Sequence, residues 1–199
     1  MNYFKNCNLC PRNCNINREK EHGYCHANNK LKIARASLHY YEEPCISGTN
    51  GSGAIFFTYC NLKCIFCQNY EISTKNIGKE ISIEKLSDIC LNLQNQGANN
   101  INLVTPTHYI PLIKEALIKA KNKGLTIPII YNTSGYEKVS SLKLLEGLID
   151  IYIPDLKYKS EILGKKYSNA PDYFNITTKA IKEMYRQVGK PKFSKEGIM

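Results

Sequence analysis

Three cysteines fall within one stretch of eight residues, at Cys60, Cys64 and Cys67. Thiolates bind zinc and iron–sulfur clusters, and three of them hold three corners of a cubane [4Fe-4S] cluster while the fourth iron stays open to an external ligand. A tetrahedral zinc site that borrows a fourth thiol, such as that of Cys45, is compatible with the same spacing. We therefore expect a metal centre in this stretch, and the spacing alone leaves both kinds of centre open.

A second group of cysteines lies near the start of the sequence, at Cys7, Cys10, Cys14 and Cys25. Four thiols close a tetrahedral site, which is then structural or electron-transferring. Metal-binding free energy would also explain how a short, Asn-rich segment without apolar periodicity stays folded. Zinc and an auxiliary iron–sulfur cluster are both open, and His22 or His26 could replace one cysteine. Cys90 lies on the apolar stripe of an expected helix, so we expect it to be a small core residue.

The composition is that of an ordinary globular chain. Of 199 residues, 43% are apolar and 22% are charged, which excludes the disordered and collagen-like classes. No stretch approaches the roughly 18 apolar residues of a membrane span, and the first residues lack the order of a signal peptide. We therefore expect a cytoplasmic protein with no membrane partner, whose nine cysteines stay free of structural disulfides in a reducing environment.

The charge balance is basic, with 27 Lys and Arg against 17 Asp and Glu, and gives a net charge of +10. Such a balance occurs in proteins that bind nucleic acid or an acidic partner. The positive residues are scattered along this sequence, so we expect a solvated Lys-rich surface rather than a nucleic-acid partner.

Apolar runs that favour β structure alternate with segments of helical periodicity after residue 46. The expected strands span 54–59, 100–104, 125–131 and 148–153. The expected helices lie between Ser82 and Gly97, between Pro111 and Gly124, over 140–146 and over 176–188. This alternation predicts an α/β fold with a parallel sheet over residues 46–199, preceded by a cysteine-rich segment over residues 1–45.

Parallel sheets carry their chemistry on the loops at the carboxyl ends of their strands. Besides the three-cysteine stretch, the polar residues at these positions are Thr105, Thr107, His108, Asn132, Thr133, Asp155 and Lys157. An aspartate at a strand end is costly to bury unpaired, so we expect Asp155 to have a catalytic function. Lys157 is a second catalytic candidate, and it could instead be only the ion-pair partner of Asp155.

The stretch from Cys60 to Cys67, with Phe66 before its last cysteine and an expected strand before its first, resembles the signature of the radical S-adenosylmethionine (SAM) superfamily. Further stretches resemble the branch that is similar to pyruvate formate-lyase activating enzyme, at 42–45, 51–53, 67–70, 104–109 and 155–158. The N-terminal pattern Cys-x2-Cys-Pro-Arg-x-Cys resembles uncharacterised relatives within that branch. The resemblance covers residues 7–197.

The resemblance implies a partial (β/α) radical SAM barrel with parallel strands, whose chain stops before the last strands. It also implies that Cys60, Cys64 and Cys67 hold a [4Fe-4S] cluster whose open iron binds the amino and carboxylate groups of SAM. One electron then breaks the sulfonium bond, and the resulting 5′-deoxyadenosyl radical abstracts a hydrogen atom. In activating enzymes this atom comes from a glycine of a partner enzyme, so the implied activity is that of an oxidoreductase.

The other strand ends gain expected roles from the same resemblance. The superfamily usually has a Gly-Gly-Glu-like turn that holds the methionyl amino group, whereas this sequence has Thr105-Pro106-Thr107-His108. Thr105 or Thr107 could offer a hydroxyl or carbonyl oxygen, or the turn could be plain, with Pro106 fixing φ. His108 could be a catalytic residue or a histidine at a helix start. The remaining positions with an expected cofactor, cation or substrate contact are Asn69, Asn132, Thr133 and Asp155.

The resemblance also implies partners. A flavodoxin- or ferredoxin-like protein would donate the electron, and a glycyl radical enzyme could be the protein substrate. Two other hypotheses remain: a non-catalytic zinc protein whose basic surface binds an acidic partner or nucleic acid, and a truncated, inactive remnant.

Overall fold

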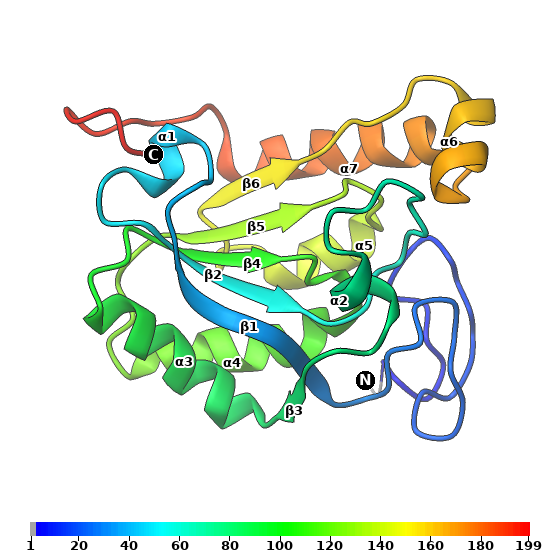
Figure 1. Ribbon diagram of the computed structural model, residues 1–199, viewed down its shortest axis with the longest axis horizontal. Coiled ribbons are helices and arrows are strands. Elements are labelled where there is room, and N and C mark those ends of the chain that lie inside the picture. The colour runs from blue at the N-terminus through cyan, green and yellow to red at the C-terminus, as the bar shows by residue number, and fades with distance from the viewer. Residues whose placement is uncertain (1–2) are drawn as a thin grey trace.

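A computed structural model describes residues 3–199 as one six-stranded sheet with helices packed along it (Figure 1). The strands are β1 (Leu31–His39), β2 (Ser52–Phe57), β3 (Lys79–Ile81), β4 (Ile101–Val104), β5 (Ile129–Thr133) and β6 (Ile151–Pro154). Their order across the sheet is β3-β1-β2-β4-β5-β6. Strands β2, β4, β5 and β6 therefore neighbour one another in the order in which they occur along the chain.

These four strands are parallel, and they all point toward the side on which α6 and the N-terminal segment lie (Figure 1). Strand β1 instead runs antiparallel to both β2 and β3. The four expected strands are thus parallel, but the expectation of a wholly parallel sheet is wrong at this edge, where β1 and β3, which were not expected, pair antiparallel. The connection from β1 to β2 contains α1 (Pro44–Ser47). The observed fold is α/β with a mixed, mostly parallel sheet, consistent with a partial β/α arrangement.

The other helices are α2 (Tyr70–Thr74), α3 (Ile83–Asn95), α4 (Ile110–Asn122), α5 (Val139–Leu142), α6 (Glu161–Ser168) and α7 (Tyr173–Val188), with 3-10 turns at Thr107–Tyr109 and Lys143–Leu145. Ser82 caps α3 as expected, because its side chain accepts a hydrogen bond from the backbone N of Lys85 at 3.0 Å. Pro111 lies in the first turn of α4. Both expected helices are confirmed.

The two faces of the sheet carry different side chains. Ile55, Leu103 and Tyr131 lie side by side on one face and belong to the main hydrophobic core, which the helices complete. On the opposite face, Asn102 is fully buried, and its amide group has no hydrogen-bond partner among residues 3–199. The helix-covered face thus supplies the core, while the other face buries a polar group near the centre of the sheet.

Residues 3–30 form loops at the end of the sheet toward which the parallel strands point (Figure 1). Arg18 fixes these loops: its guanidinium is buried and donates hydrogen bonds to the carbonyl oxygens of Ala27 at 3.0 Å, Asn28 at 2.5 Å and His108 at 2.7 Å. Leu31–His39 then enters the sheet as β1, so the range 1–45 contains a strand of the sheet. The expected division into a cysteine-rich segment and a core at residue 45 stays a prediction.

Within residues 3–199, no helix is long and apolar enough to cross a membrane.

Candidate functional site

The three-cysteine stretch forms the loop that leaves β2 at its carboxyl end, and we call residues 60–67 the cluster loop. Tyr59, directly before it, has a left-handed backbone with φ of 78°, an uncommon conformation for a bulky residue. Lys63 and Ile65 donate their backbone N–H groups to carbonyl oxygens at the end of α6, at 3.3 and 3.0 Å. The cluster loop therefore turns sharply at its start and is held in its middle by the end of α6.

Each thiol of the cluster loop has a polar neighbour. Ser168 Oγ donates to Cys64 Sγ at 2.9 Å, and the backbone N of Leu62 donates to Cys60 Sγ at 3.4 Å. Cys67 Sγ lies 3.4 Å from the hydroxyl of Ser73. Burial raises the pKa of the Cys60 thiol to about 12, and the charges of the other two cysteines act in the same direction. The three thiols therefore share one local environment.

This donor set fits an iron–sulfur cluster with one open iron. Three thiols come from one loop and influence one another, so they can supply three thiolates to a single four-iron centre. As the side chains stand, no group of three or more His, Cys, Asp or Glu among residues 3–199 is arranged to hold a metal ion. Cys45, the fourth ligand considered for a zinc site, lies in α1 at the opposite end of the parallel strands (Figure 1). The loop therefore offers three thiols.

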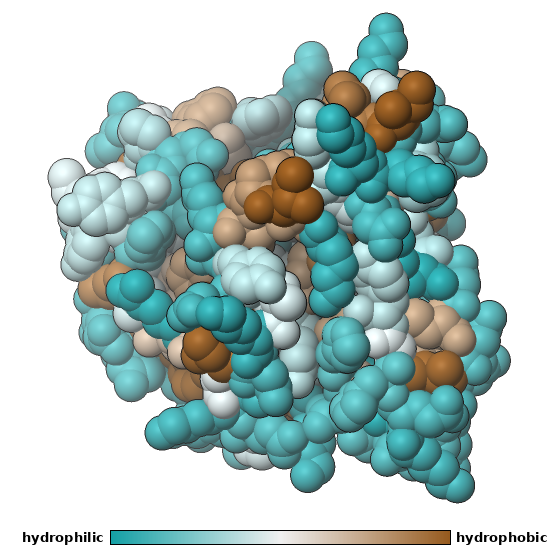
Figure 2. All heavy atoms as spheres, turned by 45° about the vertical axis from the view of Figure 1, so that its right-hand side comes forward, coloured by the Kyte–Doolittle hydropathy of each residue, from teal (hydrophilic) through white to brown (hydrophobic). Residues whose placement is uncertain are grey.

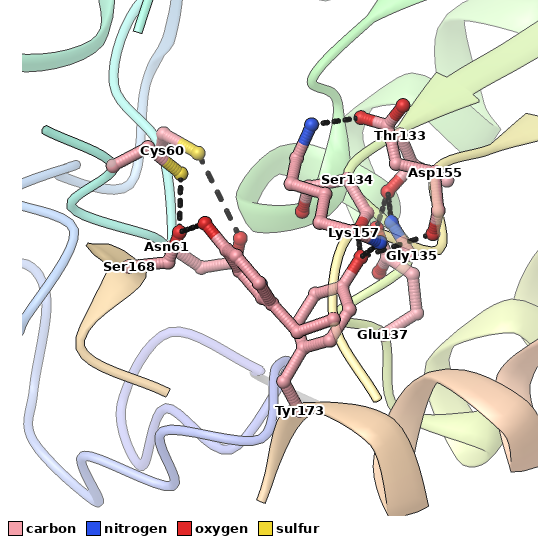
Figure 3. Close-up of polar contacts among 12 residues, drawn as sticks. Cys60, Asn61, Thr133, Ser134, Gly135, Glu137, Asp155, Lys157, Ser168 and Tyr173 are labelled. Carbon is pink, nitrogen blue, oxygen red and sulfur yellow. Dashed lines mark hydrogen bonds and ion pairs between the residues drawn. The ribbon is translucent and has the colours of Figure 1, made fainter. Parts of the chain in front are cut away.

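Asp155 and Lys157 follow β6 and form an ion pair, with Lys157 Nζ 2.5 Å from Asp155 Oδ2. The Asp155 side chain is 53% exposed, so it is paired and accessible rather than buried and unpaired. Both charges act on the pKa of the Cys64 thiol, which places the pair near the cluster loop. Tyr173 holds this segment, because its hydroxyl donates to the carbonyl oxygens of Ser134 at 2.6 Å and Asp155 at 3.0 Å. Figure 3 shows Tyr173 between the ends of β5 and β6 and the side of the site that carries Cys60.

The hydroxyls of Thr107 and Thr133 are both engaged inside the protein. They donate to the same oxygen, Oε1 of Glu137, at 2.6 and 2.5 Å, and all three side chains are buried. Burial raises the pKa of Glu137 to about 7, while these hydrogen bonds lower it. The loops after β4 and β5 are thus joined through a buried carboxyl group, so a cofactor contact through either hydroxyl would have to displace Glu137.

Thr105 has a left-handed backbone with φ of 58°, and its N–H donates to the carbonyl oxygen of Asn132 at 2.9 Å. This conformation is rare for a β-branched residue, and such strain occurs preferentially at functional sites. The contact also places Asn132 beside Thr105, at the adjacent strand end. Asn69 is exposed at the start of α2, two residues beyond the last cysteine of the cluster loop.

His108 lies apart from the exposed part of the site. Its Nε2 is 2.7 Å from the carbonyl oxygen of Thr58, and its side chain is buried. Burial lowers the pKa of His108 to about 3, so its imidazole is neutral at physiological pH. It lines a small cavity together with the four N-terminal cysteines. This placement favours the structural interpretation of His108, and its catalytic role stays a prediction.

The structure adds three residues that the sequence analysis did not single out: Glu137, Ser168 and Tyr173. Glu137 lies shortly after β5, so the rule that selected Asp155, an acidic residue beyond a strand end, could have found it. Ser168 ends α6 and Tyr173 begins α7. Neither follows a strand, and no pattern in the sequence marks them.

Comparison with known proteins gives two findings. A family model described as the Radical SAM superfamily matches residues 54–196, a range that contains the cluster loop, β4, β5 and β6. An uncharacterised protein from Methanocaldococcus jannaschii is 32% identical over 185 residues. That similarity covers 88% of this chain and 52% of the relative, so the chain spans about half the length of the curated relative that it matches.

Proposed function

Because this chain belongs to the radical SAM superfamily, we propose that Cys60, Cys64 and Cys67 hold a [4Fe-4S] cluster beside which SAM binds. The observation that carries this function is the placement of three interacting thiols on one fixed loop at the carboxyl end of β2. Such strand ends are where β/α folds gather their catalytic groups. No fourth cysteine lies in the loop, which leaves one iron of the cluster for SAM.

When bound, the cluster supplies the electron that reductively cleaves SAM to a 5′-deoxyadenosyl radical. The chain's own residues position the reactants. Ser168 donates to the sulfur of Cys64, which stabilises its thiolate form. Asp155 and Lys157, near Cys64, offer a carboxylate and an ammonium group to polar groups of SAM or of the substrate. We assign the methionyl amino group of SAM to the turn at Thr105, whose left-handed backbone turns the chain after β4.

The finer assignment is an oxidoreductase that abstracts a hydrogen atom from a glycine of a partner enzyme. Its support is the set of sequence stretches that resemble the branch similar to pyruvate formate-lyase activating enzyme, among them residues 155–158. Ile65 is 73% and Phe66 is 52% exposed in the cluster loop, so both offer apolar contacts to a protein partner.

A flavodoxin- or ferredoxin-like protein is the proposed electron donor. Figure 2 shows the face with α6 and the N-terminal segment as mainly hydrophilic, with small separate hydrophobic patches. The net charge of +10 favours encounter with an acidic donor. Association of this kind weakens as salt is added, because the charges are screened.

The test is anaerobic reconstitution with iron and sulfide, followed by reduction in the presence of SAM and an assay for 5′-deoxyadenosine. The control is the variant with Cys60→Ala, Cys64→Ala and Cys67→Ala, and Cys90→Ala serves as a matched single substitution, because Cys90 is buried in α3 away from the loop. We expect product from the wild type and from Cys90→Ala, and none from the triple variant.

Two results would contradict the proposed function. Absence of iron uptake by the wild type would favour the zinc hypothesis. A protein that carries four irons per chain but releases no 5′-deoxyadenosine would show that this chain binds the cluster without cleaving SAM.

A further inference from the structure

We propose that Cys7, Cys10, Cys14 and Cys25 form a second, closed site for a single thiophilic metal ion such as zinc. This site goes beyond the proposed function and does not depend on it. All four cysteines line one largely enclosed cavity in the N-terminal segment. They lie in a part of the chain that has its own turns and a small apolar cluster, and that adds only Cys25 and Ala27 to the main core.

The size of the cavity favours one ion over a cluster. Its volume is about 10 Å³, which is room for about one water-sized sphere. A cubane cluster brings four irons and four sulfides, whereas a tetrahedral zinc site brings one atom between four sulfurs. His22 and His26 are both exposed and do not line the cavity, so the four thiols are the ligand set.

The surroundings of the thiols supply hydrogen-bond donors of the kind that support metal-bound thiolates. The backbone N of Tyr24 donates to Cys14 Sγ at 3.3 Å, and Arg18 Nη1 lies 3.8 Å from Cys7 Sγ. Backbone N–H groups also act on the other two thiols. A side chain at Gly23 would place its Cβ 2.9 Å from Cys14 Sγ, so glycine lets the backbone approach this sulfur.

The backbone already folds the four cysteines toward one another. Cys7 N donates to the carbonyl oxygen of Ile16 at 2.8 Å, and Asn15 N donates to the carbonyl oxygen of Cys7 at 2.8 Å. Asn13 and Asn15, on either side of Cys14, adopt left-handed conformations with φ of 42° and 53°. The thiols do not yet have the arrangement of a loaded site, so binding requires them to rotate into the cavity.

Arg12 connects the proposed metal site to the cluster loop. Arg12 lies between Cys10 and Cys14, and its Nε donates to the carbonyl oxygen of Asn61 at 2.8 Å. Its guanidinium stacks 3.8 Å from the ring centre of Tyr24. An ion bound by Cys10 and Cys14 therefore restrains the backbone on both sides of Arg12, whose side chain hydrogen-bonds to Asn61 in the cluster loop.

The test uses the full chain with Cys60→Ala, Cys64→Ala and Cys67→Ala, so that metal at the cluster loop cannot contribute. The protein is purified anaerobically and loaded with zinc, and zinc, iron and acid-labile sulfide are measured. We expect about one ion per chain and no labile sulfide. Mass spectrometry after alkylation of the folded protein should show Cys7, Cys10, Cys14 and Cys25 protected when zinc is present and labelled after chelation.

Single Cys→Ser changes at the four positions should each remove most of the bound zinc, while Cys90→Ser in the same background should retain it. The alkylation pattern needs no N-terminal variant, so it remains decisive if those variants fail to fold. The inference is overturned if zinc binding is far below one ion per chain, if the protected thiols are others, or if iron is bound together with labile sulfide.

Discussion

At the scale of single residues, Glu137 is a buried ionisable group whose surroundings oppose its charge. Its carboxyl group is fully enclosed and has a pKa raised to about 7, chiefly by burial. Three titratable groups lie close enough for the charge of Glu137 to raise their pKa: Tyr131, Tyr152 and Cys10. A buried carboxyl group of this kind is protonated in the folded chain at a pH where it is ionised in the unfolded chain.

This predicts a pH dependence of stability. A raised carboxyl pKa means that the folded state binds more protons between about pH 4.5 and pH 7, so stability falls as pH rises through this window. The full penalty above pH 7 is about 3 kcal/mol. Glu137→Gln removes it, so the free energy of unfolding of the wild type, measured relative to this variant in urea, should drop between pH 5 and pH 8. An unchanged difference would mean that the carboxyl group titrates normally.

The candidate site could be predicted only where residue types and their spacing along the sequence indicate a function. The three thiols of the cluster loop could be predicted because the spacing of the cysteines directly indicates a metal centre. Asp155 could be predicted because it follows a run of apolar residues. The buried bonding of Thr107 and Thr133 was not predictable, because it depends on Glu137 reaching two loops at once. A sequence shows the hydroxyl groups but not which acceptor they meet.

At the scale of elements, the turn after β5 predicts that replacement by alanine costs more stability at Gly135 than at Gly147, although the two glycines have nearly the same backbone conformation. Gly135 has φ of 77° and Gly147 has φ of 78°. A Cβ at Gly135 would lie 2.3 Å from the carbonyl oxygen of Asp155, whereas at Gly147 nothing lies within 4 Å. Both Ala variants incur the left-handed backbone cost of about 1–2 kcal/mol. Gly135→Ala should lower the free energy of unfolding, measured in urea, by about 1–3 kcal/mol more than Gly147→Ala does. Equal losses in the two variants would show that the backbone at Asp155 moves away from the new Cβ at little cost.

The end of α6 predicts an effect on the redox properties of the site. Ser168 Oγ donates to Cys64 Sγ at 2.9 Å, and hydrogen bonds to cluster sulfurs stabilise the more negative, reduced state. Ser168→Ala should therefore make the reduction potential of the reconstituted cluster more negative in an anaerobic potentiometric titration. Ser140→Ala, an exposed change on α5, is the control. The same potential in both variants would mean that this hydrogen bond is lost on cluster binding.

Elements were predictable where local signals agree. Helix α3 has its Ser82 cap and an apolar stripe, and it begins where expected. Strand β5 was expected from residue 125 but begins at Ile129, because Pro128 has no N–H to donate to a ladder. Helix α6 was missed because Ile162 and Leu163 on it are exposed, so it shows no buried stripe. The apolar pattern indicates which residues are buried. The start of β5 and the position of α6 depend instead on hydrogen bonding.

At the scale of the whole molecule, hydrogen bonds and two buried core residues, Cys25 and Ala27, join the N-terminal segment to the sheet and its helices. The alternation of strands and helices predicted the parallel part of the sheet, but nothing local predicts that β1 and β3 add an antiparallel edge. That edge depends on pairing between residues far apart in the chain, with β1 placed between β2 and β3. The loops of residues 3–30 meet the strand ends through Arg18, and Cys25 and Ala27 also belong to the main hydrophobic core.

The hydrogen bond from Arg18 to His108, together with those to Ala27 and Asn28 inside the N-terminal segment, predicts that Arg18 contributes to the attachment of this segment. Arg18→Met keeps an apolar stem but removes three hydrogen bonds to carbonyl oxygens, each worth about 1.5–3 kcal/mol when the donor is charged. Arg35→Met is the matched control, because Arg35 is exposed and, among residues 3–199, its side chain donates only to the nearby hydroxyl of Ser37.

In limited proteolysis, Arg18→Met should be cut within residues 3–30 at a protease concentration that leaves Arg35→Met intact, while far-UV circular dichroism of both stays like that of the wild type. Selective cutting would show that the sheet folds without the segment being docked. Identical digestion of the two variants would show that other contacts, such as that of Arg12 with Asn61, hold the segment in place. Global unfolding of Arg18→Met would instead make the segment part of one cooperative unit with the sheet.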